Sequence, residues 1–551
     1  MPTSPDQPKN APVDETIKET FESIVIALIL AFVFRAYVVE AFVIPTGSMA
    51  PTLLGSHLRV TCQDCGYGFA TDWPDRNGPD RRVSTALARS ETTQCPMCQF
   101  GNKIQAKTLP SAGDRILVQK YVYSLPAMSP RRWDVVVFKA PHKPDENYIK
   151  RLVGLPNEAI MVIEGNIYVA PLTSNGQIGL WRIARKTDEQ ENTHGYKVQQ
   201  AAWQPIYHST YVPLNGVKRG WKVPWMVADG STGLWEGLDS KTGAKRTYRH
   251  DGRGRGLIRF DFALAAEDKA GLFPYNHLKG RPPSWLHDPD KLRIEDVRIA
   301  ADFQPLEQGL SLEIQTTARI DESNRPVLLA GRIGADGQAS IGKYEAFDKY
   351  QAFDEISVDS FVENRIRKLE LWFVDQELIL WVDDIPILSK QFDIPVEKVR
   401  LRPMLEEKDR WPRIAVAAEN AAVTLHRVKV DRDIYYISKQ NGRGTIWKVG
   451  KKDHYGEPFQ IKADQFFCMG DNSPESLDSR SWDKQDPRSD YDTWTWVESR
   501  KFTDPSKAQA GVVPRRLMMG RAFFVYFPAA YRISPTNLAV FPNFGQMRLI
   551  R

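Results

Sequence analysis

The sequence has few cysteines, no concentrated block of one charge and no second long apolar run. Five cysteines among 551 residues are too few for a small secreted fold held together by disulfide bonds. The 74 lysine and arginine residues nearly balance the 68 acidic ones, and no stretch sets basic residues beside aromatic pairs. We therefore expect no nucleic-acid partner. Because a second apolar run is missing, the chain after residue 40 is expected to lie on one side of any membrane.

The one long apolar run lies near the N-terminus, after a polar segment over residues 1–19. Its unbroken part reads IVIALILAFVF from Ile24 to Phe34, and residues 20–40 suffice for one helical passage through a hydrocarbon core. We predict a single transmembrane anchor at 20–40. A cleaved signal peptide is disfavoured because no small-x-small site follows, whereas a buried soluble helix stays open as an alternative.

Ser48 follows this run on a segment that cannot be regular helix or central strand. Pro45, Gly47 and Pro51 surround it, and prolines interrupt the hydrogen-bonding ladders of both structures. A serine on a fixed turn suits a nucleophile, although a Gly-Ser turn beside proline is more often only a turn.

Lys150 is a candidate chemical partner for Ser48. A buried strand is expected at 133–138, and Lys150 lies between Ile149 and Arg151 in a second short apolar pattern. A lysine on the buried face of a strand loses hydration, which lowers its pKa, and a neutral amine can take the proton of a serine hydroxyl. The alternative is that Lys150 points to solvent, as most lysines do.

A third polar segment, at 467–482, has a spacing that suits an ion pair. Asp478 and Arg480 are two residues apart, so they share one face of an extended strand. Ser476 shares that face and is a candidate partner for the lysine amine. A closing strand of the same domain is expected near 513–526.

Six strings of the sequence, taken in order, resemble the type I signal peptidase (leader peptidase) family. They are FVIPTGSMAPTL, GDRILVQKYVY, WDVVVF, YIKRLVGLPNE, GDNSPESLDSR and VVPRRLMMGRAFFVYFP. The resemblance covers about residues 17–60, 106–172 and 433–530. It implies a β peptidase core that follows a membrane anchor and needs no cofactor for catalysis.

The resemblance also carries roles to individual residues. It implies that Ser48 is the nucleophile and Lys150 the general base, and that the Thr46 hydroxyl joins the Ser48 backbone N–H in an oxyanion hole. Ser476 resembles the serine that hydrogen-bonds the lysine. Asp478 and Arg480 match the ion pair that braces this loop. The shallow S1 and S3 pockets for small side chains would be lined by Ile44, Leu53, Tyr148 and Ile149.

Three positions depart from the pattern of that family. Trp133 stands where an Arg-Gly-Asp string usually has glycine, and Asn157-Glu158 replaces Gly-Asp. Ser473 to Glu475 interrupt the Gly-Asp-Asn box. None of these changes removes a catalytic group, so they put the shape of the loops in doubt more than the activity.

Two insertions separate the matching segments, and the first, at 61–105, holds two Cys-x-x-Cys pairs. The four residues are Cys62, Cys65, Cys95 and Cys98. This spacing is typical of a zinc ribbon, in which four thiolates close a structural site. Two disulfides are the competing interpretation, because an extracytoplasmic domain lies in an oxidising compartment, and free thiols are a third. Cys468 is expected to fill space in the core.

The second insertion, at 173–432, is larger than the peptidase core and is predicted to be an antiparallel β-sandwich. Short alternating runs between turn signals begin at Leu310, Leu369, Leu378, Ile414 and Val423. The pattern loosely resembles the concanavalin-like jelly-roll sandwiches of lectins and glucanases, which implies a fold but no function.

The tryptophans Trp372, Trp381 and Trp411 of this insertion are candidates for a sugar-binding face, although positions in the sandwich core explain them better. No glycosidase pair is indicated by the spacing of Asp359, Asp383 and Asp384. We therefore expect a spacer, or a docking module for substrates, the envelope or the translocon, and not a second enzyme.

The sequence thus predicts a mainly β protein. A polar tail (1–19) and a transmembrane anchor (20–40) precede a peptidase core in three parts (41–60, 106–172 and 433–551), which a zinc-ribbon-like insertion (61–105) and a β-sandwich (173–432) interrupt.

The predicted function is that of a signal peptidase I in the bacterial cytoplasmic membrane, with its catalytic domain on the extracytoplasmic side. Its substrates would be signal peptides of exported preproteins, cut after Ala-x-Ala. Membrane lipid, the secretion translocon and a glycan or protein ligand of the sandwich are the other expected partners. A self-cleaving Ser/Lys protease of the repressor type is one alternative, and the GDNSPESLDSR string argues against it. The other is a non-catalytic envelope or carbohydrate-binding membrane protein, against which the presence of both Ser48 and Lys150 argues.

Overall fold

The structure is a computed structural model, and the residues that it describes fall into eighteen ranges. They are 13–72, 92–98, 100–104, 110–123, 128–190, 194–211, 222–238, 246–262, 294–323, 325–346, 349–400, 402, 411–438, 457–482, 511–528, 531–533, 538–541 and 543–551. Most of the polar tail expected at 1–19 therefore lies outside the described residues, as do residues 73–91 of the first insertion. The described part is mainly β.

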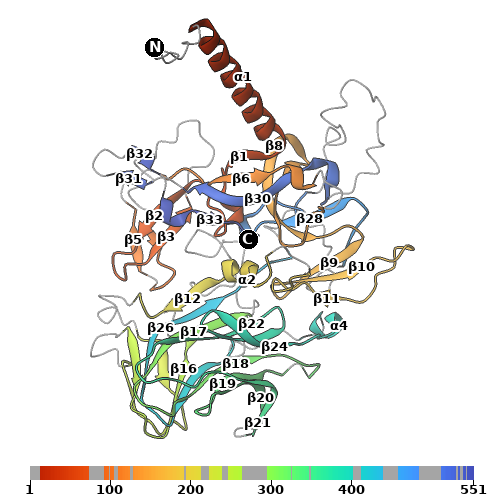
Figure 1. Ribbon diagram of the computed structural model, residues 1–551. Coiled ribbons are helices and arrows are strands. Elements are labelled where there is room, and N and C mark those ends of the chain that lie inside the picture. Colours follow the sequence, from red (N-terminus) through yellow and green to blue (C-terminus); the bar gives the residue numbers. More distant parts are fainter. Residues whose placement is uncertain are drawn as a thin grey trace, which may run out of the picture.

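The N-terminal helix α1 (Val13–Tyr37) projects from the rest of the protein (Figure 1). Its large apolar side chains between Phe21 and Phe34 are exposed. In the part of the chain that the structure describes, no helix is both long enough and apolar enough to cross a membrane. The transmembrane anchor predicted at 20–40 is therefore not supported. The unbroken apolar run from Ile24 to Phe34 covers only about 16 Å of helix axis, against a hydrocarbon core of about 30 Å.

An eight-stranded antiparallel sheet forms the centre of what we call the β core. Its order is β1 (Val39–Val43), β6 (Arg115–Gln119), β30 (Met518–Phe527), β7 (Val135–Ala140), β8 (Lys143–Gly154), β28 (Gln465–Met469) and β29 (Val513–Pro514), with β33 (Arg548–Leu549) paired to β30. The valine-rich β7 is buried at all but one position, as β-branched residues in a central strand often are. Chain segments from before, between and after the two insertions meet in this one sheet.

A second, four-stranded sheet completes the β core. It consists of β11 (Arg182–Ile183), β10 (Asn166–Pro171), β9 (Glu158–Ile163) and β27 (Phe459–Ile461). β11 falls inside the range 173–432 expected for the insertion, yet it pairs with β10. The strands of the sandwich begin only at Gln204.

Three hairpins and several short helices accompany the sheets. The hairpins are β2–β3 (His57–Thr61, Gly68–Asp72), β4–β5 (Thr92–Gln94, Gly101–Lys103) and β31–β32 (Tyr531–Ile533, Leu538–Phe541). The helices are α2 (Tyr196–Ala202), α4 (Val396–Arg400) and the 3-10 turns η1 (Gly47–Met49), η2 (Tyr121–Tyr123), η7 (Ser473–Glu475), η10 (Arg515–Leu517) and η11 (Phe544–Gln546).

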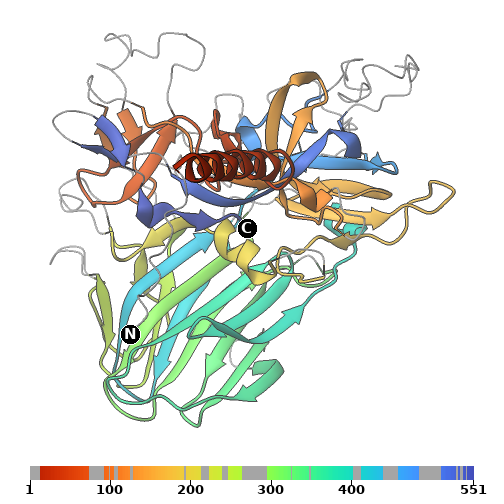
Figure 2. The same cartoon turned by 45° about the horizontal axis from the view of Figure 1, so that its top comes forward.

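The large insertion folds as two antiparallel sheets packed face to face, on the side of the β core away from α1 (Figure 2). One sheet has the order β14 (Trp235–Glu236), β15 (Thr247–His250), β26 (Val423–Arg432), β17 (Val297–Pro305), β22 (Arg367–Val374), β23 (Glu377–Val382) and β24 (Ile385–Gln391), with β12 (Gln204–His208) beside β26. The other has the order β13 (Trp225–Val227), β16 (Arg255–Phe260), β25 (Ile414–Glu419), β18 (Ser311–Ala318), β19 (Val327–Ile333), β20 (Gln338–Ala346) and β21 (Lys349–Ser357). Alternate residues of both sheets form one apolar core.

The proposed aromatic sugar-binding face does not exist as an open surface. Trp372 and Trp381 stack at 4.3 Å between ring centroids and are only 1% and 3% exposed, because Tyr196 and Trp203 at the two ends of α2 cover them. Trp411 stacks on Phe262. Trp372 and Trp381 therefore lie outside the sandwich core, on the face of their sheet that α2 covers, whereas Trp411 packs against that core.

A buried ionic cluster fastens the sandwich to the β core. The Lys186 amine, just after β11, lies 2.9 Å from an Asp375 oxygen and 2.8 Å from an Asp433 oxygen. All three side chains are almost fully buried. Asp375 belongs to the turn between two sandwich strands and Asp433 follows the last one, so one cation ties both to the core.

Lys186→Ala is expected to lower the free energy of unfolding by about 3–5 kcal/mol, because it leaves two buried carboxylates without their shared cation. Chemical denaturation would measure the loss. Lys349→Ala, which removes a lysine from an exposed pair with Glu345, is the matched control and should change nothing measurable. Equal effects of the two substitutions would show that the cluster does not hold the junction.

Candidate active site

The edge strand β1 leads directly into the Ser48 segment. Ser48 lies within η1 and is buried, with 9% of its surface exposed. Asn472 holds this turn from the far end of the chain, because its side-chain amide donates to the Gly47 carbonyl and its backbone N–H donates to the Ser48 carbonyl. The sequence therefore places Ser48 on a fixed turn, as expected, but the turn is held by a loop more than 400 residues away.

Lys150 and Ser48 come together. Lys150 lies on β8 opposite Val136 of β7, and its Nζ atom is 2.7 Å from Ser48 Oγ and 3.1 Å from the Ile149 carbonyl oxygen. Lys150 is 4% exposed. The alternative in which this lysine points to solvent is therefore excluded in the structure.

The environment of Lys150 shifts its amine toward the neutral form. Burial lowers its pKa from 10.5 to about 8, although the negative charge of Asp478 acts in the opposite direction. In its neutral form, an amine at hydrogen-bonding distance from a hydroxyl can accept that hydroxyl's proton. The arrangement can therefore activate Ser48 as a nucleophile.

The neighbouring Arg151 and Asp471 form an ion pair that the sequence analysis missed. Arg151 Nε and Nη2 donate to the two Asp471 oxygens at 2.7 and 2.6 Å, both side chains being buried. Asp471 also accepts from the Thr52 and Tyr436 hydroxyls. The adjacent basic and acidic residues in YIKRLV and GDNSP were the available signal, but nothing in the sequence pairs two positions 320 residues apart.

Asp478 and Arg480 pair as predicted, although the local structure differs from the prediction. Arg480 donates from Nε and Nη2 to the two Asp478 oxygens at 2.9 and 2.6 Å, and neither side chain is exposed. The segment is a turn and not an extended strand, because Asp478 also accepts the backbone N–H of Arg480. Arg480 further donates to the Ser473 and Ile437 carbonyls, which braces the loop.

Ser476 is buried beside the nucleophile segment but makes no hydrogen bond to Lys150. Its Oγ has no hydrogen-bond partner among the described residues. Ser476 packs on Gly470, where a Cβ atom would lie 2.2 Å from its Oγ and 2.4 Å from the Ser48 carbonyl oxygen. The expected Ser476–Lys150 hydrogen bond is therefore absent, because the Lys150 amine is directed to Ser48 instead.

The residues expected to line the substrate pockets fall into two groups. Ile44, Leu53 and Ile149 share one buried apolar cluster. Tyr148 packs against a second cluster, and its hydroxyl is 3.2 Å from His142 Nε2. Thr46 precedes η1, is exposed, and makes no capping hydrogen bond with its side chain.

The departures from the family pattern have physical explanations. Trp133 and Asn157 replace glycines, and both have positive φ, at 71° and 61°, a region that glycine enters without strain. Trp133 offsets this cost by being buried and by donating its indole N–H to the Arg185 carbonyl. Glu158, in place of aspartate, pairs with the fully buried Arg132 at 2.6 Å.

The four cysteines of the first insertion come together at the tips of two hairpins. Cys62 and Cys65 follow β2, and Cys95 and Cys98 follow β4. Their sulfur atoms all lie within 4.8 Å of one another, and the nearest pairs are 3.6 and 3.7 Å apart. Disulfide bonds need about 2.05 Å, whereas ligands about 2.3 Å from a tetrahedral ion lie near 3.8 Å from one another. These residues could therefore hold a metal ion.

The fifth cysteine and a group of three carboxylates need no metal ion to explain them. Cys468 is fully buried in an apolar cluster, as expected. Asp296, Asp375 and Asp433 also lie close enough to share an ion, but the Lys186 amine already supplies a positive charge to two of them.

Comparison with known proteins gives one family match. The family described as "Signal peptidase, peptidase S26" matches residues 17–74, 102–217 and 413–527, which together are just over half of the chain. Signal peptidase I of Rickettsia bellii (strain OSU 85-389) is 25% identical over 156 residues, 28% of this chain and 40% of that protein. Signal peptidase I of Rickettsia typhi is 26% identical over 160 residues, 29% of this chain and 46% of that protein. The chain thus spans less than half the length of these relatives.

Among solved structures, the carbohydrate binding module CBM66 from Bacillus subtilis is similar at a TM-score of 0.21 and 11% identity. The similarity covers 38% of this chain and 96% of that one. Nothing about a ligand of the inserted sandwich follows from a likeness at this level.

Lys150 is expected to titrate near pH 8 in the folded protein. Its 13Cε signal in lysine-labelled protein would report the midpoint, with Lys150→Met used to assign the signal. The exposed Lys349, whose pKa Glu345 raises from its ordinary value, should titrate at clearly higher pH than Lys150 and serves as the internal control. A Lys150 midpoint at the ordinary 10.5 would show that burial does not prepare this amine as a base.

Proposed function

Because the chain belongs to the signal peptidase (peptidase S26) family, we propose that it is a serine endopeptidase that removes signal peptides from exported preproteins. The observation that carries this proposal is the buried contact of 2.7 Å between Lys150 Nζ and Ser48 Oγ. It supplies a nucleophile and a base in one place. This contact also favours catalysis over the alternative of a non-catalytic binding protein on a peptidase scaffold.

In the proposed reaction, neutral Lys150 takes the Ser48 proton while Ser48 Oγ attacks the carbonyl carbon of the scissile bond. The protonated amine then returns the proton to the leaving amino group of the mature protein. A water molecule deprotonated by Lys150 hydrolyses the resulting ester and frees Ser48. We assign to the Ser476 hydroxyl, which has no hydrogen-bond partner among the described residues, the role of accepting from the lysine amine once Ser48 has turned to the substrate.

The oxyanion is assigned to the Ser48 backbone N–H and the Thr46 hydroxyl. Thr46 suits this role because its side chain is not engaged in capping η1 and can donate to a developing charge. Asp478 and Arg480 act as positioning residues, because their pair fixes the loop that carries Ser476.

Specificity for small residues follows from the apolar wall around Ser48. The substrate would lie extended along the edge strand β1, adding backbone hydrogen bonds to the sheet. The P1 and P3 side chains would then meet Ile44, Leu53, Tyr148 and Ile149. These bulky residues leave room for alanine, so we propose cleavage after Ala-x-Ala.

The place of action that fits this substrate is the extracytoplasmic face of a bacterial cytoplasmic membrane. The exposed apolar side chains of α1 suit contact with lipid, because apolar surface leaves water favourably. A signal peptide ending at the bilayer surface would then reach Ser48 close to the base of α1. The secretion translocon is the neighbour that would deliver such substrates.

We further propose that Cys62, Cys65, Cys95 and Cys98 hold a structural zinc ion. Four thiolates are the donor set that zinc prefers in closed sites. Asn102 supports the arrangement, because its amide nitrogen is 3.7 Å from Cys62 Sγ and its oxygen accepts the Gln63 backbone N–H. The ion would fix the two hairpins to each other and takes no part in the peptidase reaction.

Ser48→Ala and Lys150→Met are each expected to lower kcat/KM by about 10³-fold or more, measured with a fluorogenic Ala-x-Ala signal-peptide substrate. Lys349→Ala is the matched lysine control and should cleave at the rate of the unsubstituted protein. Activity should fall as pH drops through about 8, because protonated Lys150 cannot accept the Ser48 proton. Cleavage by either Ser48→Ala or Lys150→Met at the rate of the control would contradict the proposed mechanism.

Thr46→Val should lower kcat by about 10²-fold with little change in KM, because the lost hydrogen bond forms mainly in the transition state. Thr46→Ser keeps the hydroxyl and should retain most of the activity. If both variants behave alike, the oxyanion hole does not use this side chain.

Purified protein is expected to contain one zinc ion per chain by elemental mass spectrometry. Cys62→Ser and Cys95→Ser should lose it and unfold at a lower temperature, because the metal is bound only by the folded hairpins. Cys468→Ser removes a cysteine outside the cluster and should keep the zinc. A metal-free protein lighter by four hydrogen atoms would instead establish two disulfides.

A further inference from the structure

The outer face of the smaller sandwich sheet carries a polar cavity that the peptidase reaction does not use. It measures about 380 Å³, within the range of small-ligand pockets. Its walls come from β18, β19, β20, β21 and β25, at the end of the sandwich far from α1 (Figure 1). It is therefore a separate site from the Ser48 turn.

A single row of residues across the sheet builds this cavity. Register places Ala417, Glu313, Arg332, Ser340 and Glu355 opposite one another on five successive strands. Their neighbours in sequence, such as Leu312 and Ile341, belong to the apolar core, so this row faces outward. The small Ala417 side chain leaves the floor open.

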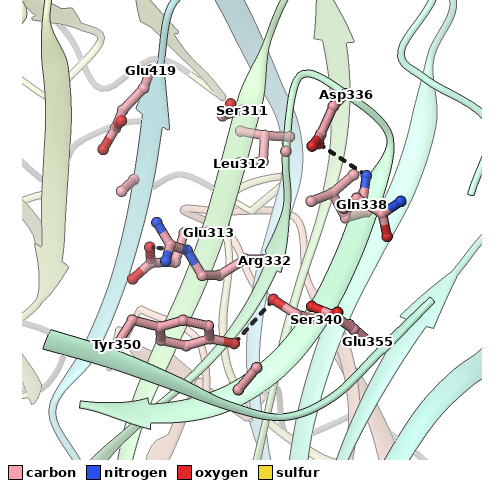
Figure 3. A pocket seen from close by; sticks show the side chains of 14 residues that line it. Ser311, Leu312, Glu313, Arg332, Asp336, Gln338, Ser340, Tyr350, Glu355 and Glu419 are labelled. Atoms are coloured by element: carbon pink, nitrogen blue, oxygen red, sulfur yellow. Dashed lines mark hydrogen bonds and ion pairs between the residues drawn. The ribbon is translucent and has the colours of Figure 1, made fainter. Parts of the chain in front are cut away.

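The groups inside the cavity are fixed in position (Figure 3). Arg332 Nε lies 3.0 Å from Glu313, and its guanidinium group stacks 4.5 Å above the Tyr350 ring. The Tyr350 hydroxyl is 3.1 Å from Ser340 Oγ. Glu313 also accepts from the Tyr344 hydroxyl at 2.7 Å. The side chains therefore need little reorganisation to meet a ligand.

The chemistry of the cavity selects its class of ligand. Four carboxylates line it, those of Glu313, Asp336, Glu355 and Glu419, against the guanidinium of Arg332. Arg255, beside the cavity, pairs with Glu419 at 3.0 Å and lies 3.7 Å from Glu313, so the carboxylates still outnumber the two cations. This excess of negative charge disfavours phosphates and other anions. The lining interleaves acceptors with donors from Arg332, Ser340 and Tyr350, and more of its exposed surface is polar than apolar.

We propose that this cavity binds a neutral saccharide. Each hydroxyl of a sugar both donates and accepts, so adjacent hydroxyls match a wall on which carboxylate oxygens alternate with N–H and O–H donors. The exposed Glu355 and Asp336 at the rim supply acceptors, while Arg332 has more N–H groups than Glu313 alone can accept. The inference goes beyond peptide cleavage and does not depend on it.

Calorimetric titration of the full chain with four neutral tetrasaccharides tests the proposal. The probes are cellotetraose, maltotetraose, mannotetraose and tetra-N-acetylchitotetraose, with tetragalacturonate as the anionic counterpart and spermine as a cation. We expect at least one neutral probe to bind with a dissociation constant below about 1 mM and tetragalacturonate not to bind.

Variants locate the binding in the cavity. Ala417→Leu fills the floor and should abolish binding, while Glu355→Gln keeps the shape of the side chain and should weaken it about tenfold or more. Glu397→Gln on α4 changes an exposed glutamate elsewhere and should bind normally. All three should cleave the signal-peptide substrate at the unsubstituted rate, so a failure here is distinguishable from a failure of the peptidase assignment.

Three results would overturn the proposal. They are the absence of binding by every neutral probe up to 10 mM (about 10-fold above the expected limit), binding that Glu355→Gln leaves unchanged, and binding of spermine alone. The last would identify the cavity as a site for cations. Because Glu355 is exposed, its variant tests the cavity even if Ala417→Leu fails to fold.

Discussion

The geometry of Ser48 and Lys150 depends on the ion pair between Arg151 and Asp471. Lys150 and Arg151 are neighbours on β8, so their side chains leave the strand on opposite faces. While Lys150 reaches Ser48, Arg151 binds Asp471, and Asp471 in turn accepts from Thr52, four residues after Ser48. Lys150 and Ser48 are thus held at one distance by a contact that touches neither of them. Removing one partner of such a buried pair costs about 3–5 kcal/mol, and here the loss would also loosen the Ser48 turn.

The two buried lysines, Lys150 and Lys186, differ in which charge state their surroundings favour. Lys186 lies in contact with two carboxylates and is held in its charged form, which raises its pKa. Lys150 contacts a hydroxyl and a carbonyl, so burial dominates and its pKa falls. The same residue type is therefore a charged ion-pair partner in one place and the proposed base in the other, and the difference lies only in which acceptors the fold brings near.

Much of the site could be predicted from the sequence, because its residues lie in short motifs that can be recognised locally. Ser48 on a proline-bounded turn and Lys150 in an apolar strand were both recognisable locally, and the alternating runs of the insertion gave its strands. The partners of Arg151 and Lys186 could not be predicted, since they lie on segments that only the folded chain brings together. The turn at Asp478 was taken for a strand because a two-residue spacing fits both structures, and burial of Trp372 depended on α2, which has no strong sequence pattern.

The two ends of the sandwich lie side by side, since Gln204 on β12 is paired with Arg432 on β26. A segment of more than two hundred residues therefore leaves and re-enters the β core at nearly one point. Once folded, this segment acts as a short connection and adds little to the entropic cost of closing the core sheet. All sandwich strands are contiguous in sequence, whereas the core must wait for β28 and β30 from beyond them. During synthesis the insertion can fold first as a unit. Lys150 then remains in water and charged until the last part of the chain emerges to enclose it, so an incompletely made chain does not hold Lys150 against Ser48.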